Sequence, residues 1–230
     1  YRLLEALNRS GVAANMLTLH KRSDNDNVVE VGNNIFNKYC FTAERAAIYI
    51  QNGFSRKNLF DISIANTGVS ITNYRAFKRT DIVHLHWINQ GMLSVREIGE
   101  IVASGKKIVW TMHDMWSFTG ICHHARKCKR FETGCGLCPY LNNPSKGDIS
   151  YYTYLQKQAA YSLGRIHFVA CSNWLKELAI KSKLTKNHNV SAIPNHINTD
   201  TYIPKDNPTV RIAMKLPIDK KIILFAAAKV

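Results

Sequence analysis

Pairs of polar or aromatic residues directly follow several predicted strands, and their side chains have the chemistry to bind a small polar ligand. The pairs are His86 with Trp87, His113 with Asp114, Ser172 with Asn173, and Asn195 with His196. In an open parallel sheet, the ligand crevice lies outside the carboxyl ends of the strands. We therefore expect these pairs to converge at one edge of a sheet, although they lie far apart in the sequence.

The pair His113 and Asp114 is the strongest candidate for a functional role. It follows the apolar segment 107–112, so a buried strand would present both side chains at its end. A neutral imidazole offers one hydrogen-bond donor and one acceptor, which suits a hydroxyl group. The alternative is a solvated pair that only ends a strand. The crevice rule favours the functional interpretation.

Other aromatic and histidine side chains near the strand ends remain open to two interpretations. His84 and His86 lie two residues apart on one strand and so share a face. We expect His84 to pack under a helix and His86 to face the cleft, because no further ligands for a metal can be placed beside them. Trp87 and Trp116 suit either stacking on the ring of a ligand or packing in the core.

A cysteine cluster occupies the predicted loop 113–148. Its members are Cys122, Cys128, Cys135 and Cys138, separated by five, six and two residues. We expect a structural zinc ion held by these four thiolates, which would order the long loop. His123 or His124 could replace one thiol. Two disulfides, or four unpaired thiols, are the alternatives.

The elements that must position these residues alternate between strand and helix. Predicted strands cover 12–19, 61–65, 81–87, 107–112, 166–171, 190–193 and 221–228. Predicted helices cover 1–10, 36–50, 71–77, 95–103, 149–163, 173–181 and 210–216, with Ser94 and Ser172 as caps. This alternation predicts an α/β fold, a Rossmann-like parallel sheet with helices on both faces.

Composition and charge narrow the class of protein. The chain has 230 residues, of which 46% are hydrophobic and 20% charged, and this argues against a disordered chain. No apolar run approaches the roughly 20 residues of a membrane-spanning helix. The formal net charge of +15 favours acidic partners, although the basic residues are dispersed.

Five sequence segments resemble the acceptor-side half of glycosyltransferase family 4, in particular the bacterial capsule and exopolysaccharide enzymes. They are DIVHLHWI at 81–88, VWTMHDMWSFTG at 109–120, CGLCP at 135–139, ACSNWL at 170–175 and IPNHIN at 193–198. The resemblance implies the GT-B architecture, in which two Rossmann-like domains face each other across a cleft. It also implies transfer of a sugar from a nucleotide-sugar donor to a glycan or lipid-linked glycan acceptor, with retention at the anomeric carbon.

The same resemblance assigns expected roles to the strand-end residues. His113 is expected to hydrogen-bond the transferred sugar, and Asp114 to orient loop amides or to accept a hydrogen bond from the acceptor. The residues expected to bind substrate are His86, Trp87, Ser172, Asn173 and Asn195. A cytoplasmic location, with peripheral contact to the anionic inner face of a membrane, would suit the basic charge and a lipid-linked acceptor.

Departures from the family pattern shape the expected domain organisation. The glycine-rich loop after the family's first strand is absent, and His196 and Asn198 replace the usual Gly and Asp of their segment. We expect residues 1–203 to form the acceptor-side domain without its first strand. Residues 204–230 would be a linker and the first strand of a donor-binding domain, so that the domain pair is truncated at both ends.

The rival interpretation is a zinc-containing nucleic-acid-binding module. This interpretation is based on the net charge, the cysteine cluster and the basic segment 126–130. It does not explain the strand-end pairs, and no basic helix or aromatic platform is evident, so we expect no nucleic-acid partner. A non-catalytic sugar-binding protein is a third possibility.

Overall fold

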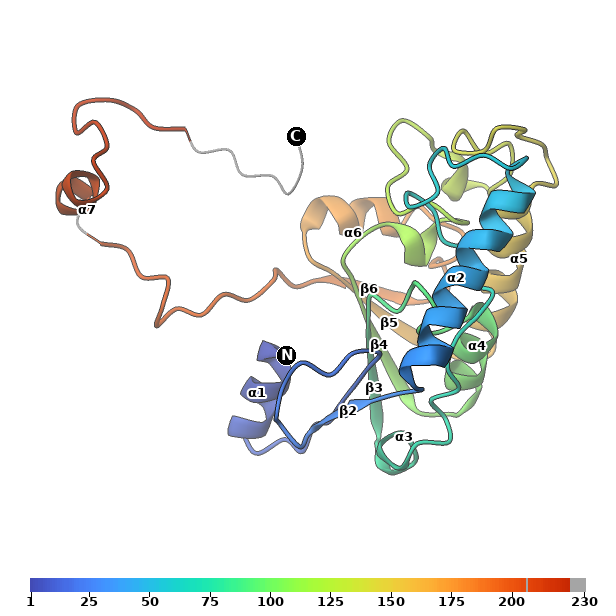
Figure 1. Cartoon of the computed structure of the whole chain (residues 1–230), viewed down its shortest axis with the longest axis horizontal. Coiled ribbons are helices and arrows are strands. Elements are labelled where there is room, and N and C mark those ends of the chain that lie inside the picture. The colour runs from blue at the N-terminus through green and yellow to red at the C-terminus, as the bar shows by residue number, and fades with distance from the viewer. Residues whose placement is uncertain (206, 224–230) are drawn as a thin grey trace. The chain divides into compact units, whose positions relative to one another are not determined.

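The computed structural model describes residues 1–205 and 207–223, which fall into two compact units, 1–194 and 195–230 (Figure 1). The first unit contains a four-stranded parallel sheet in the order β3-β4-β5-β6. Its strands are β3 (Ile82–His86), β4 (Lys107–Met112), β5 (Ile166–Ala170) and β6 (Asn189–Ala192). A small second sheet pairs β1 (Met16–Thr18) with β2 (Val28–Glu30), also in parallel.

Helices lie on both sides of the parallel sheets, which confirms the Rossmann-like α/β fold (Figure 1). They are α1 (Arg2–Arg9), α2 (Asn34–Gln51), α3 (Arg75–Arg79), α4 (Val95–Ala103), α5 (Ile149–Ser162) and α6 (Asn173–Ala179). Helix α4 packs on α5, and α6 packs on β5 and β6. The second unit contains α7 (Asn207–Ala213). Among residues 1–205 and 207–223, no helix is both long and apolar enough to cross a membrane.

Local sequence signals explain the strands and helices that position the site. On β3, Val83 and Leu85 are buried, while the alternate residues face outward. Helix α4 begins at a capping box, in which Ser94 and Glu97 each satisfy a backbone N–H of the other. Ser172 likewise accepts a hydrogen bond from the N–H of Leu175 and starts α6. These caps were expected from the sequence, and the structure confirms them.

An aromatic core fixes β4, β5 and α5 together. Trp110 of β4 stacks on Phe168 of β5 with ring centroids 5.7 Å apart. Tyr161 of α5 packs against Trp110 in a T-shaped arrangement, with ring centroids 5.9 Å apart. Lys157 of α5 is fully buried, and its Nζ donates to the carbonyl of Trp116 at 2.6 Å. Burial lowers the pKa of Lys157 well below its usual value. Helix α5 thus holds the chain segment that follows β4.

The predicted strand 61–65 is wrong, because this segment forms only one isolated bridge, between Ile62 and Cys122. Two charged side chains of α2 satisfy its backbone instead. The Glu44 carboxylate accepts from the N–H groups of Ile64 and Ala65 at 2.9 and 2.7 Å. Arg45 donates to the carbonyl of Ile62 at 3.0 Å. The apolar pattern of the segment therefore reflects burial without a strand partner.

Smaller differences concern the ends of elements. Strand β1 is shorter than the predicted 12–19, β2 was not expected, and α3 begins four residues after the predicted start at 71. Residues 221–223 of the predicted strand 221–228 are not in a strand, and the rest of that prediction lies outside the described residues.

Candidate active site

Three neighbouring strands of the larger sheet end beside one another. His86 pairs in register with Thr111, and Met112 pairs with Ala170, so β3, β4 and β5 finish at the same edge. The pairs expected at these ends, 86–87, 113–114 and 172–173, therefore share one edge of the sheet. Asn195 lies in the second unit, so its place in the site stays a prediction.

Side chains after β3 and β4 are in direct contact. The Nδ1 of His86 and the Nε2 of His113 lie 3.1 Å apart, and the two rings stack with centroids 5.4 Å apart. The indole N–H of Trp87 donates to the Asp114 carboxylate at 3.2 Å. The structure thus brings together four of the residues that the sequence singled out.

A hollow of about 210 Å³ opens at this edge. It is lined by Trp87, Asn89, Trp110, Thr111, Met112, His113, Asp114, Trp116 and Ser117. Trp87 is 46% exposed at the rim, and its backbone adopts a φ of +23°, which is uncommon outside glycine. Its exposed ring is placed to pack against a ligand, whereas Trp116 is 1% exposed and belongs to the core.

Asp114 is the most highly connected side chain of the site. One carboxylate oxygen accepts from the N–H of Trp116 at 2.8 Å, and the other pairs with Nδ1 of His123 at 2.7 Å and accepts from Trp87. Burial raises the pKa of Asp114, but these hydrogen bonds outweigh it and lower the pKa below its ordinary value. The carboxylate is therefore ionised at neutral pH and held in one orientation.

His123 joins this site from the cysteine-rich loop. Its Nε2 lies 2.9 Å from the hydroxyl oxygen of Ser63, and its backbone N–H donates to Asp61. A chain of contacts therefore runs from Ser63 through His123 and Asp114 to the indole of Trp87. Sequence reasoning missed this role, because it assigned His123 only as a substitute metal ligand. No local signal pointed to the pairing, which depends on segment 61–65 lying beside residue 123.

His84 does not pack under a helix, which corrects the sequence-based expectation. It shares the outward face of β3 with His86, and the centroids of the two rings lie 4.2 Å apart. Its Nε2 contacts the hydroxyl oxygen of Thr111 at 2.8 Å. Burial of the ring, followed by the positive charge of His113, lowers the pKa of His84. The neutral ring of His84 therefore lies against the ring of His86, which in turn stacks on the ring of His113.

Ser172 and Asn173 stand beside the hollow rather than among its lining residues. The hydroxyl of Ser172 accepts from the N–H of Leu175 as the helix cap. Asn173 is exposed at the first turn of α6. The structure thus gives Ser172 a capping function, and the substrate contacts expected of both residues stay predictions.

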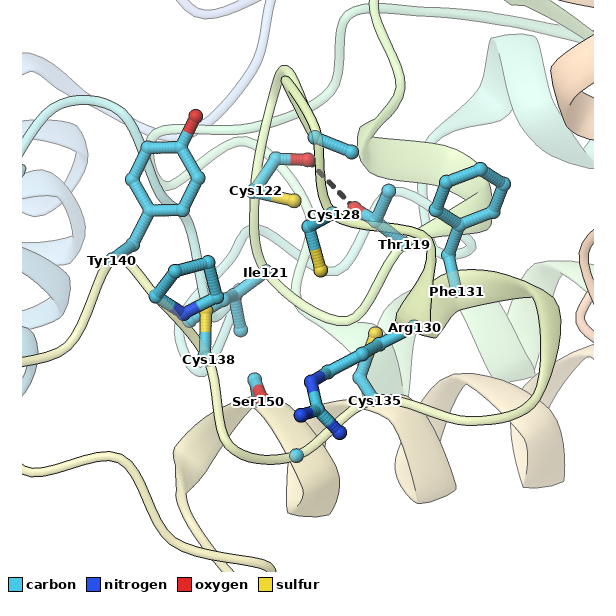
Figure 2. A pocket seen from close by; sticks show the side chains of 13 residues that line it. Thr119, Ile121, Cys122, Cys128, Arg130, Phe131, Cys135, Cys138, Tyr140 and Ser150 are labelled. Carbon is cyan, nitrogen blue, oxygen red and sulfur yellow. Dashed lines mark hydrogen bonds between the residues drawn. The ribbon is translucent and has the colours of Figure 1, made fainter.

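A larger cavity, of about 330 Å³, lies among the cysteines and away from the strand-end hollow. Figure 2 shows Cys122, Cys128, Cys135 and Cys138 around it, with Phe131 and Tyr140 among its other lining residues. The loop around this cavity is ordered by hydrogen bonds, such as that from Thr119 Oγ1 to the carbonyl of Cys122 at 2.6 Å (Figure 2).

The expected zinc site is not supported by this arrangement. In the part of the chain that the structure describes, no three His, Cys, Asp or Glu side chains are placed to hold a metal ion. The four cysteines are free thiols that line one cavity without forming a ligand group. Burial raises the pKa of Cys122 and Cys138 to about 12 and that of Cys135 to about 11. Without a bound metal ion, these three thiols are therefore neutral at pH 7.

Comparison with known proteins agrees with this geometry. The model of Glycosyltransferase Family 4 matches residues 1–201. A protein of Escherichia coli (strain K12) named as a colanic acid biosynthesis glycosyl transferase, WcaC, is 38% identical over 81 residues. That match covers 30% of this chain and 20% of the relative. No solved structure matches the chain significantly. The family match extends through the sheet and every residue of the strand-end hollow, and the chain belongs to glycosyltransferase family 4.

Proposed function

We propose that this chain is the acceptor-side part of an enzyme that transfers a sugar from a nucleotide-sugar donor to a glycan or lipid-linked glycan, with retention at the anomeric carbon. Family membership and a relative named for colanic acid biosynthesis support a role in polysaccharide biosynthesis. The observation that carries the proposal is a hollow at the carboxyl edge of the sheet that Trp87, His113 and Asp114 line, with His86 in contact with His113.

His113 is the proposed catalytic residue of this part of the enzyme. Its ring lines the hollow, and its Nε2 is held 3.1 Å from the Nδ1 of His86. An imidazole held in this way can hydrogen-bond a hydroxyl of the transferred sugar while charge develops at the anomeric carbon. Hexosyl transfer fits this role, because a hexose ring carries several such hydroxyls.

Asp114 acts mainly as a positioning residue in this proposal. Three hydrogen bonds from the protein already occupy its two oxygens, so it has little capacity left for substrate. It orients the loop amide of Trp116 and the ring of Trp87. Trp87 would then pack against the apolar face of a sugar. Ser172, Asn173 and Asn195 are proposed as outer contacts of the same substrate.

The donor nucleotide would be held by a second Rossmann-like domain, of which residues 204–230 are proposed to be the beginning. The family resemblance supports this division. The second domain would stabilise the negative charge that develops on the diphosphate, and closure of the cleft would bring the donor to His113.

The basic charge of the chain suits a cytoplasmic enzyme that contacts an anionic membrane carrying a lipid-linked acceptor. A net charge of +15 should give binding to vesicles that contain phosphatidylglycerol but not to vesicles of phosphatidylcholine alone. Co-sedimentation should show this binding at low salt and its loss at about 0.5 M salt, where charges are screened. Equal binding to both vesicle types would contradict the proposed contact.

The central test is His113→Ala in the complete transferase that contains this chain. We expect turnover to fall by roughly 100-fold or more, as for the loss of one well-placed polar contact to a transition state. Transfer of radiolabelled sugar from a panel of nucleotide sugars measures the effect. His167→Ala is the matched control, because His167 also lies on the sheet but contacts Ser191 outside the hollow. Unchanged turnover in a folded His113→Ala variant would remove His113 from the site.

A further inference from the structure

Two buried polar side chains in the strand-end hollow are left without a hydrogen-bond partner. Asn89 is 4% exposed and Ser117 is 3% exposed, and both line the hollow beside His113. Within residues 1–205 and 207–223, neither Nδ2 of Asn89 nor Oγ of Ser117 has a partner. Leaving such a group buried and unpaired costs about 1–3 kcal/mol, so native proteins rarely do so without a reason.

Two equally buried side chains of the same types elsewhere in the first unit, Ser182 and Asn52, are paired. The hydroxyl of Ser182 donates to the carbonyl of Phe118 at 2.7 Å and accepts from the N–H of Leu184. The amide of Asn52 contacts Lys57 and the N–H of Asn142. The buried Asn37 also leaves its Oδ1 without a partner, but its Nδ2 donates to the carbonyls of Leu19 and Val31. Each of these three side chains is therefore anchored by hydrogen bonds, and the two in the hollow differ from them.

The backbone around Ser117 is held firmly on both sides. Asp114 accepts from the N–H of Trp116, and Lys157 donates to the carbonyl of Trp116. The hydroxyl of Tyr161 donates to the carbonyl of Ser117 at 2.9 Å. A hydroxyl on such a fixed segment is preorganised, so little entropy is lost when a ligand binds to it.

We propose that Asn89 and Ser117 bind a hydroxyl group of the sugar substrate at the buried surface of the hollow. This assignment rests on the proposed function and names substrate contacts that the strand-end pattern did not include. A sugar hydroxyl can accept from the Asn89 amide and donate to the oxygen of Ser117. If the oxygen and nitrogen of the Asn89 amide were exchanged, the sugar hydroxyl would donate to the amide oxygen and accept from the hydroxyl of Ser117. The match therefore holds for either orientation of the amide.

The charge of the hollow favours a neutral group over an acidic one. The ionised carboxylate of Asp114 lines the same hollow, and it would repel a carboxylate or phosphate placed beside it. Trp87, exposed at the rim, offers an aromatic face against which the C–H groups of a pyranose ring can pack. The aromatic face of Trp87, together with the polar side chains of Asn89 and Ser117, fits a neutral sugar.

Binding and stability should change in opposite ways when these residues are replaced. Asn89→Leu and Ser117→Ala remove unpaired polar atoms, so each variant should unfold in urea at the same concentration as the wild type or at a higher one. Binding of methyl glycosides of glucose, galactose or fucose, followed by the side-chain amide and backbone NMR signals of the hollow, should weaken about tenfold in each variant. Asn52→Leu and Ser182→Ala are the matched controls, which should lose stability and keep the affinity of the wild type.

Each other outcome overturns the assignment. If the two variants lose stability as the controls do, a buried water or the protein itself already satisfies these groups. If their affinity is unchanged, or if no methyl glycoside shifts the signals of the hollow in the wild type, the groups do not bind a sugar hydroxyl. Because none of these measurements needs sugar transfer, their failure is distinct from failure of the His113→Ala test of the proposed function.

Discussion

At the scale of single residues, Asp114 connects the strand-end hollow to the cysteine-rich loop. It receives hydrogen bonds from the indole of Trp87 and the backbone of Trp116, and it pairs with the imidazole of His123. Trp116 lies two residues along the chain, whereas Trp87 follows β3 and His123 belongs to the cysteine-rich loop. The orientation of Trp87 therefore depends, through Asp114, on His123, which is not among the residues that line the hollow.

Replacing His123 tests this connection through the ionisation of Asp114. The pKa of Asp114 is lowered in the folded chain, so its stabilising effect is complete above the unfolded pKa of about 3.9 and is lost as the pH falls through the folded value. In His123→Leu the pKa of Asp114 should rise, and the variant should be less stable than the wild type by about 1–3 kcal/mol at pH 7. That difference should shrink as the pH falls below about 4 and then through the lower pKa of the folded wild type, below which its carboxylate is also protonated.

Carboxyl ¹³C NMR and urea unfolding at both pH values measure these effects. His123→Asn is the conservative variant, since its amide can still donate to Asp114 and should restore part of the shift. His124→Leu is the control, because His124 stacks on Trp174 and makes no hydrogen bond to Asp114. An unchanged Asp114 pKa in His123→Leu would show that the contact does not hold the carboxylate.

At the scale of elements, the cysteine-rich loop is organised around a cavity and is held by α5. Lys157 donates to the carbonyls of Trp116 and Thr119, and the N–H of Gly120 donates to the sulfur of Cys135 at 3.1 Å. These contacts come from backbone and lysine groups. They order the loop through packing and hydrogen bonding while the thiols of Cys122, Cys135 and Cys138 stay protonated.

The thiols of this loop should react slowly with alkylating reagents. A pKa of about 12 for Cys122 and Cys138 lowers the thiolate fraction by about three orders of magnitude relative to an ordinary thiol, and only the thiolate is the nucleophile. At pH 8 we expect iodoacetamide to label both at least a hundredfold more slowly in the folded chain than in urea.

Peptide mass spectrometry measures the labelling rate at each site, and elemental analysis of the same sample measures its metal content. The unfolded chain is the control for intrinsic reactivity. Rapid labelling of Cys122 and Cys138 in the folded chain would contradict the neutral, buried thiols. One zinc per chain would do so as well, because it would show that the cysteines serve as ligands.

At the scale of the whole molecule, the two units differ sharply in how much they bury. The first unit contains the hydrophobic core, whereas the described side chains of the second are almost all exposed. Helix α7 is short, and the described residues on either side of it, 195–205 and 214–223, are not in strands. Local opening of such a segment costs little free energy, because few apolar contacts must be broken.

Limited proteolysis should therefore cut the second unit before the first. We expect trypsin to cleave first at Lys205, Arg211 or Lys215, between the end of β6 and residue 221. Intact-mass spectrometry over time should show a core that contains residues 1–194 and persists after these cuts. Lysines of the first unit, such as the buried Lys157, serve as the internal control. Earlier cleavage within the first unit would contradict the difference in local stability.

The sequence by itself determined the strands and helices that carry strong local signals. The apolar runs that became β3, β4 and β5 and the caps at Ser94 and Ser172 depend on nearby residues, so periodicity and capping chemistry were sufficient to predict them. The rule that parallel strands end at one edge then placed His86, Trp87, His113 and Asp114 together. The family resemblance came from the same segments.

Tertiary structure alone decided the features that depend on distant partners. Segment 61–65 has the composition of a strand, but Glu44 and Arg45 of α2 satisfy its backbone. Cysteine spacing along a loop does not fix the distances between sulfur atoms, so four clustered thiols lined a cavity without forming a metal group. The contact between His123 and Asp114, and the unpaired groups of Asn89 and Ser117, arise from chain segments that meet only in the folded protein. A hydrogen bond is satisfied or left open by three-dimensional packing, which no local pattern of residues encodes.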